Sequence, residues 1–322
     1  MKCFTFCSSS YDPYYNLALE EHLLSQVTPG SVILYLWQNA HTVVIGRNQN
    51  PWAECRTSLL QDEDGHLARR LSGGGAVYHD LGNLNFTFLC REEDYNLHRQ
   101  LSVIQSACAM ADIEAEFSGR NDLLADGRKF SGNAFYHSKG AAYHHGTLLI
   151  DTNVERLGRY LSPPKAKLES KGVASVRSRV VNLNTLSPGL TCEIMKEYMT
   201  RAFGTIYGST PQPLFLSEQS RQAVLQLQAR YRSEEWLFGK PMPFSCGLEG
   251  HFPWGHLELL LQIEGGVIQN TTVYTDAMDS TLPEQICSAL NGCAFQTEIM
   301  EKAFSGLEKA EDLSAWLRNQ EL

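Results

Sequence analysis

The sequence has few of the features that mark membrane, secreted or repeat proteins. Among its 322 residues, no apolar run approaches the roughly 20 residues that a membrane-spanning helix needs, and the longest, residues 32–37, has the length of a strand. It contains no internal repeat and no low-complexity tract. The first residues carry one basic side chain and soon become polar, which argues against a secretory signal. We therefore expect a folded protein that does not act in a membrane.

Positive charge and paired cysteines are also scarce. The chain has 27 Lys and Arg against 36 Asp and Glu, a formal net charge of −9, which makes it a poor partner for nucleic acid because phosphates would repel it. Its nine cysteines form no CxxC pair. Without a signal sequence, an odd number of scattered cysteines indicates free thiols in a reducing compartment, so a cytoplasmic protein is expected.

The hydrophobic pattern predicts a mixture of strands and helices. With 43% hydrophobic residues the chain has ample material for a core, and its length suggests about two domains. Strands and helices follow one another without regular βαβ alternation, which favours an α+β fold. Apolar spacing predicts helices near residues 13–26, 97–108 and 195–206, and strands at residues 32–37, 42–46 and 83–89.

A change of character near residues 238–243, where two prolines flank a methionine, predicts a connector. Beyond it, residues 257–263 alternate up to Glu264-Gly265-Gly266, and residues 267–274 return as the second arm of a hairpin. Helical patterns follow at residues 283–290 and about 310–317. We predict a catalytic domain over residues 1–245 and a small α/β accessory domain over residues 246–322.

The densest motif is the glycine-rich stretch at residues 69–80. Gly73, Gly74 and Gly75 permit positive φ and let backbone N–H groups approach a ligand, and Arg70 adds a positive charge beside them. Such a nest suits a carboxylate or a phosphate, although a bare glycine turn would look similar. The absence of a following Gly-Lys-Ser/Thr excludes a Walker loop.

Two charged residues stand out further along the chain, each close to glycine and serine. Asp122, within Gly119-Arg120-Asn121-Asp122, suits the phosphate side of a Mg²⁺ site. Lys129, before a Ser-Gly pair that we interpret as a turn, could stabilise a phosphate or a developing oxyanion. Taken singly, each residue is as ordinary as any surface charge, and their value lies in occurring together.

Two further clusters follow. His144 and His145 are adjacent on a predicted strand, so they point to opposite faces and cannot share one metal ion. One of them should face a pocket, and the other should be ordinary sheet surface. Residues 165–179 concentrate basic charge among small residues, which is equally consistent with a solvated loop and with a flap that closes over a nucleotide.

Taken together, these motifs resemble the lipoate–protein ligase A family. The resemblance covers nearly the whole chain and is carried by residues 46–52, 69–88, 119–122, 129–134, 144–147 and 171–183. It implies the biotin/lipoate protein ligase fold, a mixed sheet with flanking helices that is distantly like the class II synthetase catalytic domain. It also implies the small C-terminal domain noted above.

The resemblance implies a reaction in two steps. Lipoate, or octanoate, and MgATP would give acyl-AMP and pyrophosphate, after which a lysine of an acceptor protein would attack the mixed anhydride. The implied acceptors are lipoyl domains of 2-oxoacid dehydrogenase E2 subunits and the glycine-cleavage H protein, with no nucleic acid and no membrane as partners.

The resemblance also implies roles for individual residues. Lys129 would be the catalytic lysine, and Asp122 the Mg²⁺ ligand. The implied lipoate-binding residues are Glu20, Trp37, Arg70, Ser72, Gly73, Gly74, Gly75, Tyr143 and His145. The implied ATP- or adenylate-binding residues are Arg70, Gly75, Val77, Tyr78, His79, Asn83, Asn121, Asp122, Lys129, Thr147, Ser175 and Arg177.

Three alternatives stay open at this point. The chain could transfer the acyl group from preformed lipoyl-AMP without an activation step. It could use an octanoyl carrier protein, but that route needs a cysteine nucleophile, and no cysteine lies within the glycine, lysine or histidine motifs. It could also bind lipoate without catalysis, which the presence of Lys129 disfavours. We rank the ATP-dependent ligase above these.

Overall fold

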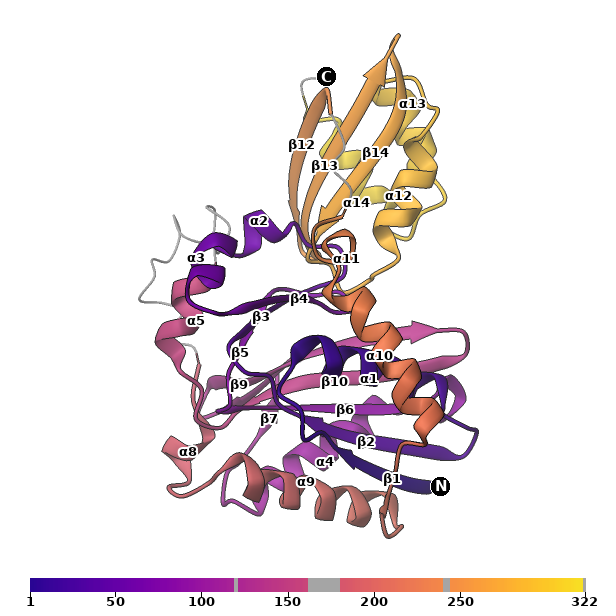
Figure 1. Ribbon diagram of the computed structural model, residues 1–322. Coiled ribbons are helices and arrows are strands. Elements are labelled where there is room, and N and C mark those ends of the chain that lie inside the picture. Colours follow the sequence, from indigo (N-terminus) through magenta and orange to yellow (C-terminus); the bar gives the residue numbers. More distant parts are fainter. Residues whose placement is uncertain (119–120, 162–179, 240–243, 321–322) are drawn as a thin grey trace. The chain divides into compact units, whose positions relative to one another are not determined.

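The computed structural model describes residues 1–118, 121–161, 180–239 and 244–320, and the chain divides into two compact units (Figure 1). Unit 1 consists of Met1–Ile45, Pro51–Arg70 and Ala76–Leu237. Unit 2 consists of Gly46–Asn50, Leu71–Gly75 and Phe238–Leu322. Each unit therefore combines segments that are far apart in the sequence, and each is described by itself.

Unit 1 is built on a mixed sheet of eight strands. In spatial order the strands are β11 (Gln212–Pro213), β1 (Lys2–Cys7), β2 (Ser31–Trp37), β6 (Asn83–Arg91), β10 (Ala141–Leu149), β9 (Arg128–Ser138), β8 (Asp122–Ala125) and β7 (Glu116–Phe117). Strand β1 is parallel to both β11 and β2, whereas each pair from β2 through to β7 is antiparallel. The sheet confirms the predicted mixed α and β architecture.

One face of this sheet carries the main core of unit 1. Leu84, Phe86 and Phe88 of β6 point to it and pack with the apolar sides of α4 (Leu97–Ala109) and α9 (Cys192–Tyr207), which Figure 1 shows together along that face. Because β-strand side chains alternate between faces, the residues between these three must point to the opposite side.

The opposite face is polar but equally buried. Asn83, Asn85 and Thr87 of β6 point to it, and each is at most 1% exposed. This side is covered in part by α1 (Pro13–Ser25) and by α10 (Glu218–Arg232), which packs against α1 (Figure 1). Helix α1 begins where the sequence predicts, because the Asp12 side chain accepts hydrogen bonds from the first free backbone N–H groups. We call this side the polar face.

A smaller sheet and several short helices complete unit 1. In the small sheet, β3 (Thr42–Ile45) lies between β4 (His66–Arg69) and β5 (Val77–His79). The short helices are α2 (Pro51–Glu54), α3 (Thr57–Asp62), η1 (Glu92–Asp94), α5 (Val154–Tyr160), α8 (Leu183–Leu186) and α11 (Glu234–Phe238). Strand β5 leads through a tight turn into β6, and this connection places His79 next to the polar face.

Unit 2 consists of a three-stranded antiparallel sheet covered by helices. The strands are β12 (Cys246–Phe252), β13 (Gly255–Glu264) and β14 (Val267–Thr275), and the helices are α12 (Leu282–Leu290), α13 (Thr297–Phe304) and α14 (Ala310–Leu317). Its core joins alternate leucines of β13 to the apolar sides of these helices. The predicted hairpin and the helices at residues 283–290 and 310–317 are confirmed, whereas α13 was not predicted.

The glycine-rich segment Leu71–Gly75 belongs to unit 2 by its contacts. Gly74 donates its backbone N–H to the Ala277 carbonyl at 3.1 Å. A Cβ on Gly73 would stand 2.3 Å from the same carbonyl oxygen, so no other residue fits there, and Gly74 has a φ of 86°.

Among the residues that the structure describes, no helix is both long and apolar enough to cross a membrane.

Candidate functional site

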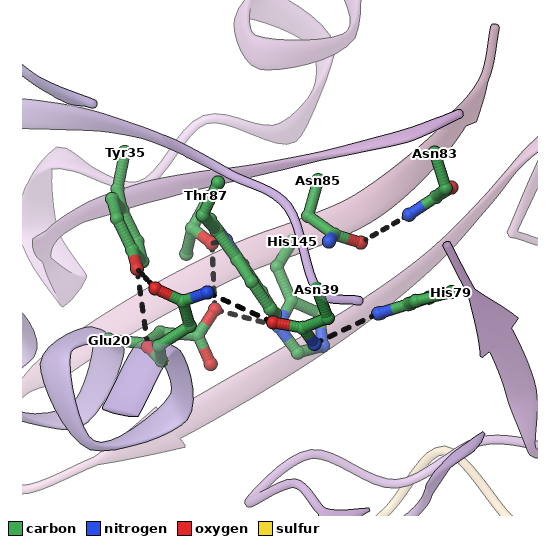
Figure 2. A network of polar contacts seen from close by, with 10 residues as sticks. Glu20, Tyr35, Asn39, His79, Asn83, Asn85, Thr87 and His145 are labelled. Atoms are coloured by element: carbon green, nitrogen blue, oxygen red, sulfur yellow. Dashed lines mark hydrogen bonds and ion pairs between the residues drawn. The ribbon is translucent and has the colours of Figure 1, made fainter. Parts of the chain in front are cut away.

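Four buried side chains on the polar face form a hydrogen-bonded set that we call the Glu20 network. It consists of Glu20, Trp37, Thr87 and His145, of which Figure 2 labels Glu20, Thr87 and His145. Trp37 donates its indole N–H to Thr87 Oγ1 at 3.1 Å, and Thr87 donates in turn to Glu20 Oε1 at 2.7 Å. His145 Nδ1 lies 2.9 Å from the same carboxylate oxygen. The network holds the Trp37 ring in one orientation.

Strand register explains why these residues meet. His145 of β10 and Tyr35 of β2 lie directly opposite Thr87 on its two sides, so all three point to the same face. The Tyr35 ring stacks on Trp37 at 5.8 Å between centroids, and Tyr143 lies 4.8 Å from His145. The four predicted wall residues of the lipoyl pocket, Glu20, Trp37, Tyr143 and His145, are therefore brought together.

Next to this network lie three residues with unused hydrogen-bonding atoms, which we call the His79 cluster: His79, Asn83 and Asn85. Asn83 donates to Asn85 Oδ1 at 2.9 Å. His79 Nε2, Asn83 Oδ1 and Asn85 Nδ2 are buried and have no hydrogen-bond partner among the described residues. Buried polar atoms are nearly always paired, so these three indicate a place for polar atoms of a ligand.

The His79 cluster lies against Trp37, which is a member of the Glu20 network. Across the β2–β6 pairing, Asn85 lies directly opposite Trp37, and the His79 ring meets the Trp37 ring edge-on at 6.0 Å. On its other side Asn85 lies opposite Thr147, which was predicted to bind ATP. A ligand that contacts the His79 cluster would therefore lie beside the indole.

Arg70 is the buried cation of this region. Its guanidinium donates to the Val44 carbonyl at 3.2 Å, and the side chain is almost fully buried. Burial lowers its pKa to about 10, while nearby Tyr143 and Glu20 act to raise it, so Arg70 stays charged at neutral pH. A buried cation with further donors around it favours a carboxylate or phosphate ligand.

Lys129 is aimed by an irregularity in the sheet. We interpreted the Ser-Gly pair beside it as a turn, which is wrong: both residues lie within β9, and the turn is at Asp126 and Gly127. Leu123 of β8 pairs with Ser131 of β9, but Leu124 pairs with Lys129, so the register shifts and the pairing skips Phe130. This bulge sends Phe130 into the apolar core and Lys129 back over Gly132, where a Cβ would stand 3.0 Å from Nζ.

The Lys129 ammonium pairs with Asp122 Oδ1 at 2.7 Å, and both side chains are about one-third exposed. Asn133 anchors the neighbouring loop, because both its backbone N–H and its side-chain amide donate to the Asn121 carbonyl, at 2.8 and 2.9 Å. The predicted residues Asn121, Asp122 and Lys129 thus form one local group. No set of three or more His, Cys, Asp or Glu in the described part of the chain is placed to hold a metal ion.

His144 does not lie at the sheet surface, as the sequence suggested, but in the core. It is fully buried against Phe86, Phe88 and Phe135, with Nε2 2.8 Å from Asn133 Oδ1. Burial lowers its pKa to about 3, so it is neutral. Its contact with Asn133 makes it a support for the loop at Asn121. Helices cover both faces of this sheet, which explains why His144 is buried.

Of the remaining predicted site residues, Tyr78 and Val77 of unit 1 have other neighbours. Tyr78 points away from His79, since the two are adjacent on β5, and it stacks on Tyr160 at 5.7 Å. Val77 pairs through β5 with Val44. Ser72, Gly73, Gly74 and Gly75 belong to unit 2. Ser175 and Arg177, with Gly119, Arg120 and the rest of residues 162–179, lie outside the described residues.

Sequence reasoning missed three residues that the geometry places here: Asn39, Asn85 and Thr87. A signal existed for two of them, because Asn83, Asn85 and Thr87 alternate on one face of a strand that carries the predicted Asn83. Asn39 follows β2 in a loop and had no such pattern. It hydrogen-bonds to His79 at 3.2 Å (Figure 2).

The arrangement can bind an anionic group attached to a less polar one. Arg70 and Lys129 supply positive charge, the His79 cluster supplies neutral hydrogen-bonding atoms, and Trp37 and Tyr143 supply aromatic surface. Such a combination suits a carboxylic acid with an apolar chain and a phosphorylated partner.

Solved structures of similar proteins share this fold. LipL1 of P. falciparum, described in complex with lipoate, is 28% identical, with a TM-score of 0.86 over 98% of this chain and 99% of that one. A lipoate-protein ligase A bound with ATP is 24% identical, with a TM-score of 0.66 over 74% of this chain and 99% of the other. The bipartite ligase of Thermoplasma acidophilum, described with its E2 lipoyl domain, is 24% identical, with a TM-score of 0.68 over 76% and 98%.

Two family models match the sequence itself. The lipoyl protein ligase A/B catalytic domain matches residues 12–204, and the bacterial lipoate protein ligase C-terminus matches residues 242–321. The first match covers more than half of the chain. The protein belongs to the lipoyl protein ligase A/B family, which confirms the resemblance seen in the sequence.

Proposed function

We propose that this chain is an ATP-dependent lipoate–protein ligase. It would activate lipoate or octanoate with MgATP to an acyl-AMP and then transfer the acyl group to a lysine of an acceptor protein. The acceptors would be lipoyl domains of 2-oxoacid dehydrogenases or the glycine-cleavage H protein. The observation that carries the proposal is the position of Lys129, which a bulge turns back over Gly132 and Asp122 holds in an ion pair.

In the first step, the lipoate carboxylate would attack the α-phosphate of ATP, and pyrophosphate would leave. The ammonium of Lys129 would stabilise the negative charge that builds on the phosphate, and Arg70 would hold the carboxylate. In the second step, the acceptor amine would attack the acyl carbonyl and AMP would leave. The same ammonium would stabilise charge on the carbonyl oxygen, so one residue would serve both steps.

Binding would use the remaining residues of the polar face. Trp37, fixed by Thr87, would close the pocket for the acyl chain and limit its length through what does not fit. Asn83, Asn85 and His79 would contact polar atoms of the adenylate. Asp122 fits one carboxylate ligand of Mg²⁺, which usually takes its other ligands from phosphates and water, and the ion would neutralise phosphate charge.

The carrier-protein route is disfavoured by the state of the thiols. Burial raises the pKa of Cys55, Cys90 and Cys108 to about 12. A cysteine nucleophile needs the opposite shift, because the thiolate is the reactive form.

The test is transfer to an apo-lipoyl domain, measured by intact mass. One reaction contains free lipoate, ATP and Mg²⁺, and the other contains synthetic lipoyl-AMP without ATP. The proposal predicts the lipoyl mass increase in both, and none on an acceptor whose target lysine is replaced. Transfer from lipoyl-AMP alone would make the chain a lipoyltransferase, and transfer in neither reaction would overturn the proposal.

A further inference from the structure

His79 is held on one side by Asn39, and the geometry of that contact decides which ring nitrogen carries the proton. Asn39 Nδ2 lies 3.2 Å from His79 Nδ1. An amide has a donor end and an acceptor end that differ little in shape. The side of Asn39 that faces His79 must therefore be established from its other contacts.

Asn16 establishes the orientation of Asn39. Its Nδ2 lies 2.9 Å from two backbone carbonyls, those of Ser10 and Gln38, which can only accept hydrogen bonds. Its Oδ1 accepts from Ser8 and Tyr35 at 2.7 and 3.1 Å. The Asn16 amide cannot be reversed without setting its oxygen against both carbonyls.

Asn16 in turn fixes the orientation of Asn39, whose contact with His79 is drawn in Figure 2. Asn39 Oδ1 lies 3.0 Å from Asn16 Nδ2, whose two hydrogens are shared among this oxygen and the two carbonyls. An amide nitrogen cannot accept a hydrogen bond, so a reversed Asn39 would set its NH2 group against that of Asn16. The NH2 group of Asn39 is therefore the end that faces His79. Asn39 donates to His79 Nδ1, which must accept. A neutral imidazole that accepts at Nδ1 carries its proton at Nε2.

His79 is neutral in this setting. Burial lowers its pKa to about 3, and the neighbouring Arg70 and His145 act in the same direction. The Trp37 ring lies against the His79 ring in a T-shaped arrangement, with 6.0 Å between the centroids. His79 Nε2 therefore presents an uncharged N–H donor, and it has no hydrogen-bond partner among the described residues.

We propose that Asn39 is a positioning residue that holds His79 as the neutral Nε2–H tautomer, so that this N–H donates to an oxygen or nitrogen of the bound acyl-adenylate. The inference rests on the proposed function for the identity of the ligand. An uncharged donor suits this place because Arg70 already supplies the positive charge.

Asn39→Asp tests the proposal because it changes one atom of the chain of hydrogen bonds. The new carboxylate still accepts from Asn16, but it can only accept from His79, so Nδ1 becomes protonated and the pKa of His79 rises. Above that pKa the ring has a lone pair at Nε2 and the donor is lost; below it the ring donates from both nitrogens. Lipoate-dependent pyrophosphate exchange by Asn39→Asp should fall as pH rises, by about 2- to 10-fold for one hydrogen bond.

Two controls separate the loss of the His79 Nε2–H donor from a general effect of the substitution on the structure. In the His79→Gln background, where an amide N–H takes the place of Nε2–H, Asn39→Asp should add no pH-dependent step. Nitrogen NMR of labelled imidazoles in the unsubstituted protein should show His79 neutral and protonated at Nε2, and this readout does not depend on activity.

Three results would overturn the proposal: an Nδ1–H tautomer, an unchanged pH profile in folded Asn39→Asp, or a pH step that persists without His79. If the unsubstituted chain catalyses no exchange, the proposed function fails and the Kd for lipoyl-AMP replaces the rate. The expected dependence on pH and on Asn39 is then the same, and its absence contradicts the proposal.

Discussion

The Glu20 network and the His79 cluster lie on the same polar face and meet at Trp37, which belongs to the network. They differ in whether all their hydrogen-bonding atoms have partners. In the network, Thr87 both accepts and donates, and the Glu20 carboxylate faces two partners within 2.9 Å. In the cluster, one atom of each residue has no partner among the described residues. Both are buried, so exposure to solvent does not explain the difference.

We interpret the difference as one between residues that would form the pocket and residues that would contact the ligand. A saturated buried network stabilises one arrangement of the fold, and removing a member leaves the others unpaired. Atoms that lack partners add little to stability and gain their hydrogen bonds only when a ligand binds. We therefore expect substitutions in the network to lower stability first, and substitutions in the cluster to lower activity first.

The largest expected effect is that of Glu20→Ala on stability. It leaves His145 and Thr87 without their shared acceptor in a buried site, which should lower the free energy of unfolding by about 3–5 kcal/mol. Urea titration measures it, with Glu193→Ala as control, because Glu193 is 76% exposed and pairs with Lys196 in a surface ion pair. Equal stability of the two variants would remove the distinction.

Lys129→Ala should affect activity and leave stability almost unchanged. Losing one charge-stabilising group costs about 10²- to 10³-fold in rate, whereas its side chain is 38% exposed and adds little to the core. Single-turnover transfer rates and thermal unfolding measure the two. Arg128→Ala, which removes an exposed positive charge from the adjacent position on β9, is the matched control. An undiminished rate in Lys129→Ala would contradict the mechanism.

Asn85→Ala should have a smaller effect on activity. It removes one hydrogen bond to the ligand, which corresponds to about a 2- to 10-fold loss in kcat/KM for lipoate or ATP. Asn270→Ala, on the exposed part of β14, should change neither constant. A loss of stability in Asn85→Ala without any kinetic change would move Asn85 from the cluster to the network.

The smallest effect concerns protons taken up on unfolding. Burial holds the pKa of His144 at about 3, well below the ordinary value of about 6.5. As pH falls below 6.5, the unfolded chain binds a proton that the folded chain does not, so stability falls, by about 0.7 kcal/mol per such histidine between pH 7 and 6. His144→Gln should reduce that difference by the same amount, and identical pH slopes would show that His144 is not held neutral.

Much of the fold could be predicted because hydrophobic spacing and capping agree with the tertiary structure. Helix α1 begins at Pro13 after the Asp12 cap, and β6 alternates as its residues 83–89 indicate. Helix α13 was missed, although α14, which has the same length of eight residues, was predicted. The burial of His144 was missed because one strand does not reveal that helices cover both faces of its sheet.

The site was predictable where it depends on residue type and unpredictable where it depends on register. Lys129 and Asp122 were found as charges among small residues, but the bulge that turns Lys129 over Gly132 depends on how β8 pairs with β9. The association of Leu71–Gly75 with unit 2 depends on a contact with Ala277, more than 200 residues later. Local sequence carries no signal for such contacts.

The most direct test of the account is lipoate-dependent exchange of labelled pyrophosphate into ATP, with Mg²⁺ and without any acceptor protein. The account predicts exchange that requires lipoate or octanoate, because in the proposed function this chain forms the acyl-adenylate itself. Absence of exchange in a protein that still transfers the lipoyl group from synthetic lipoyl-AMP would contradict it.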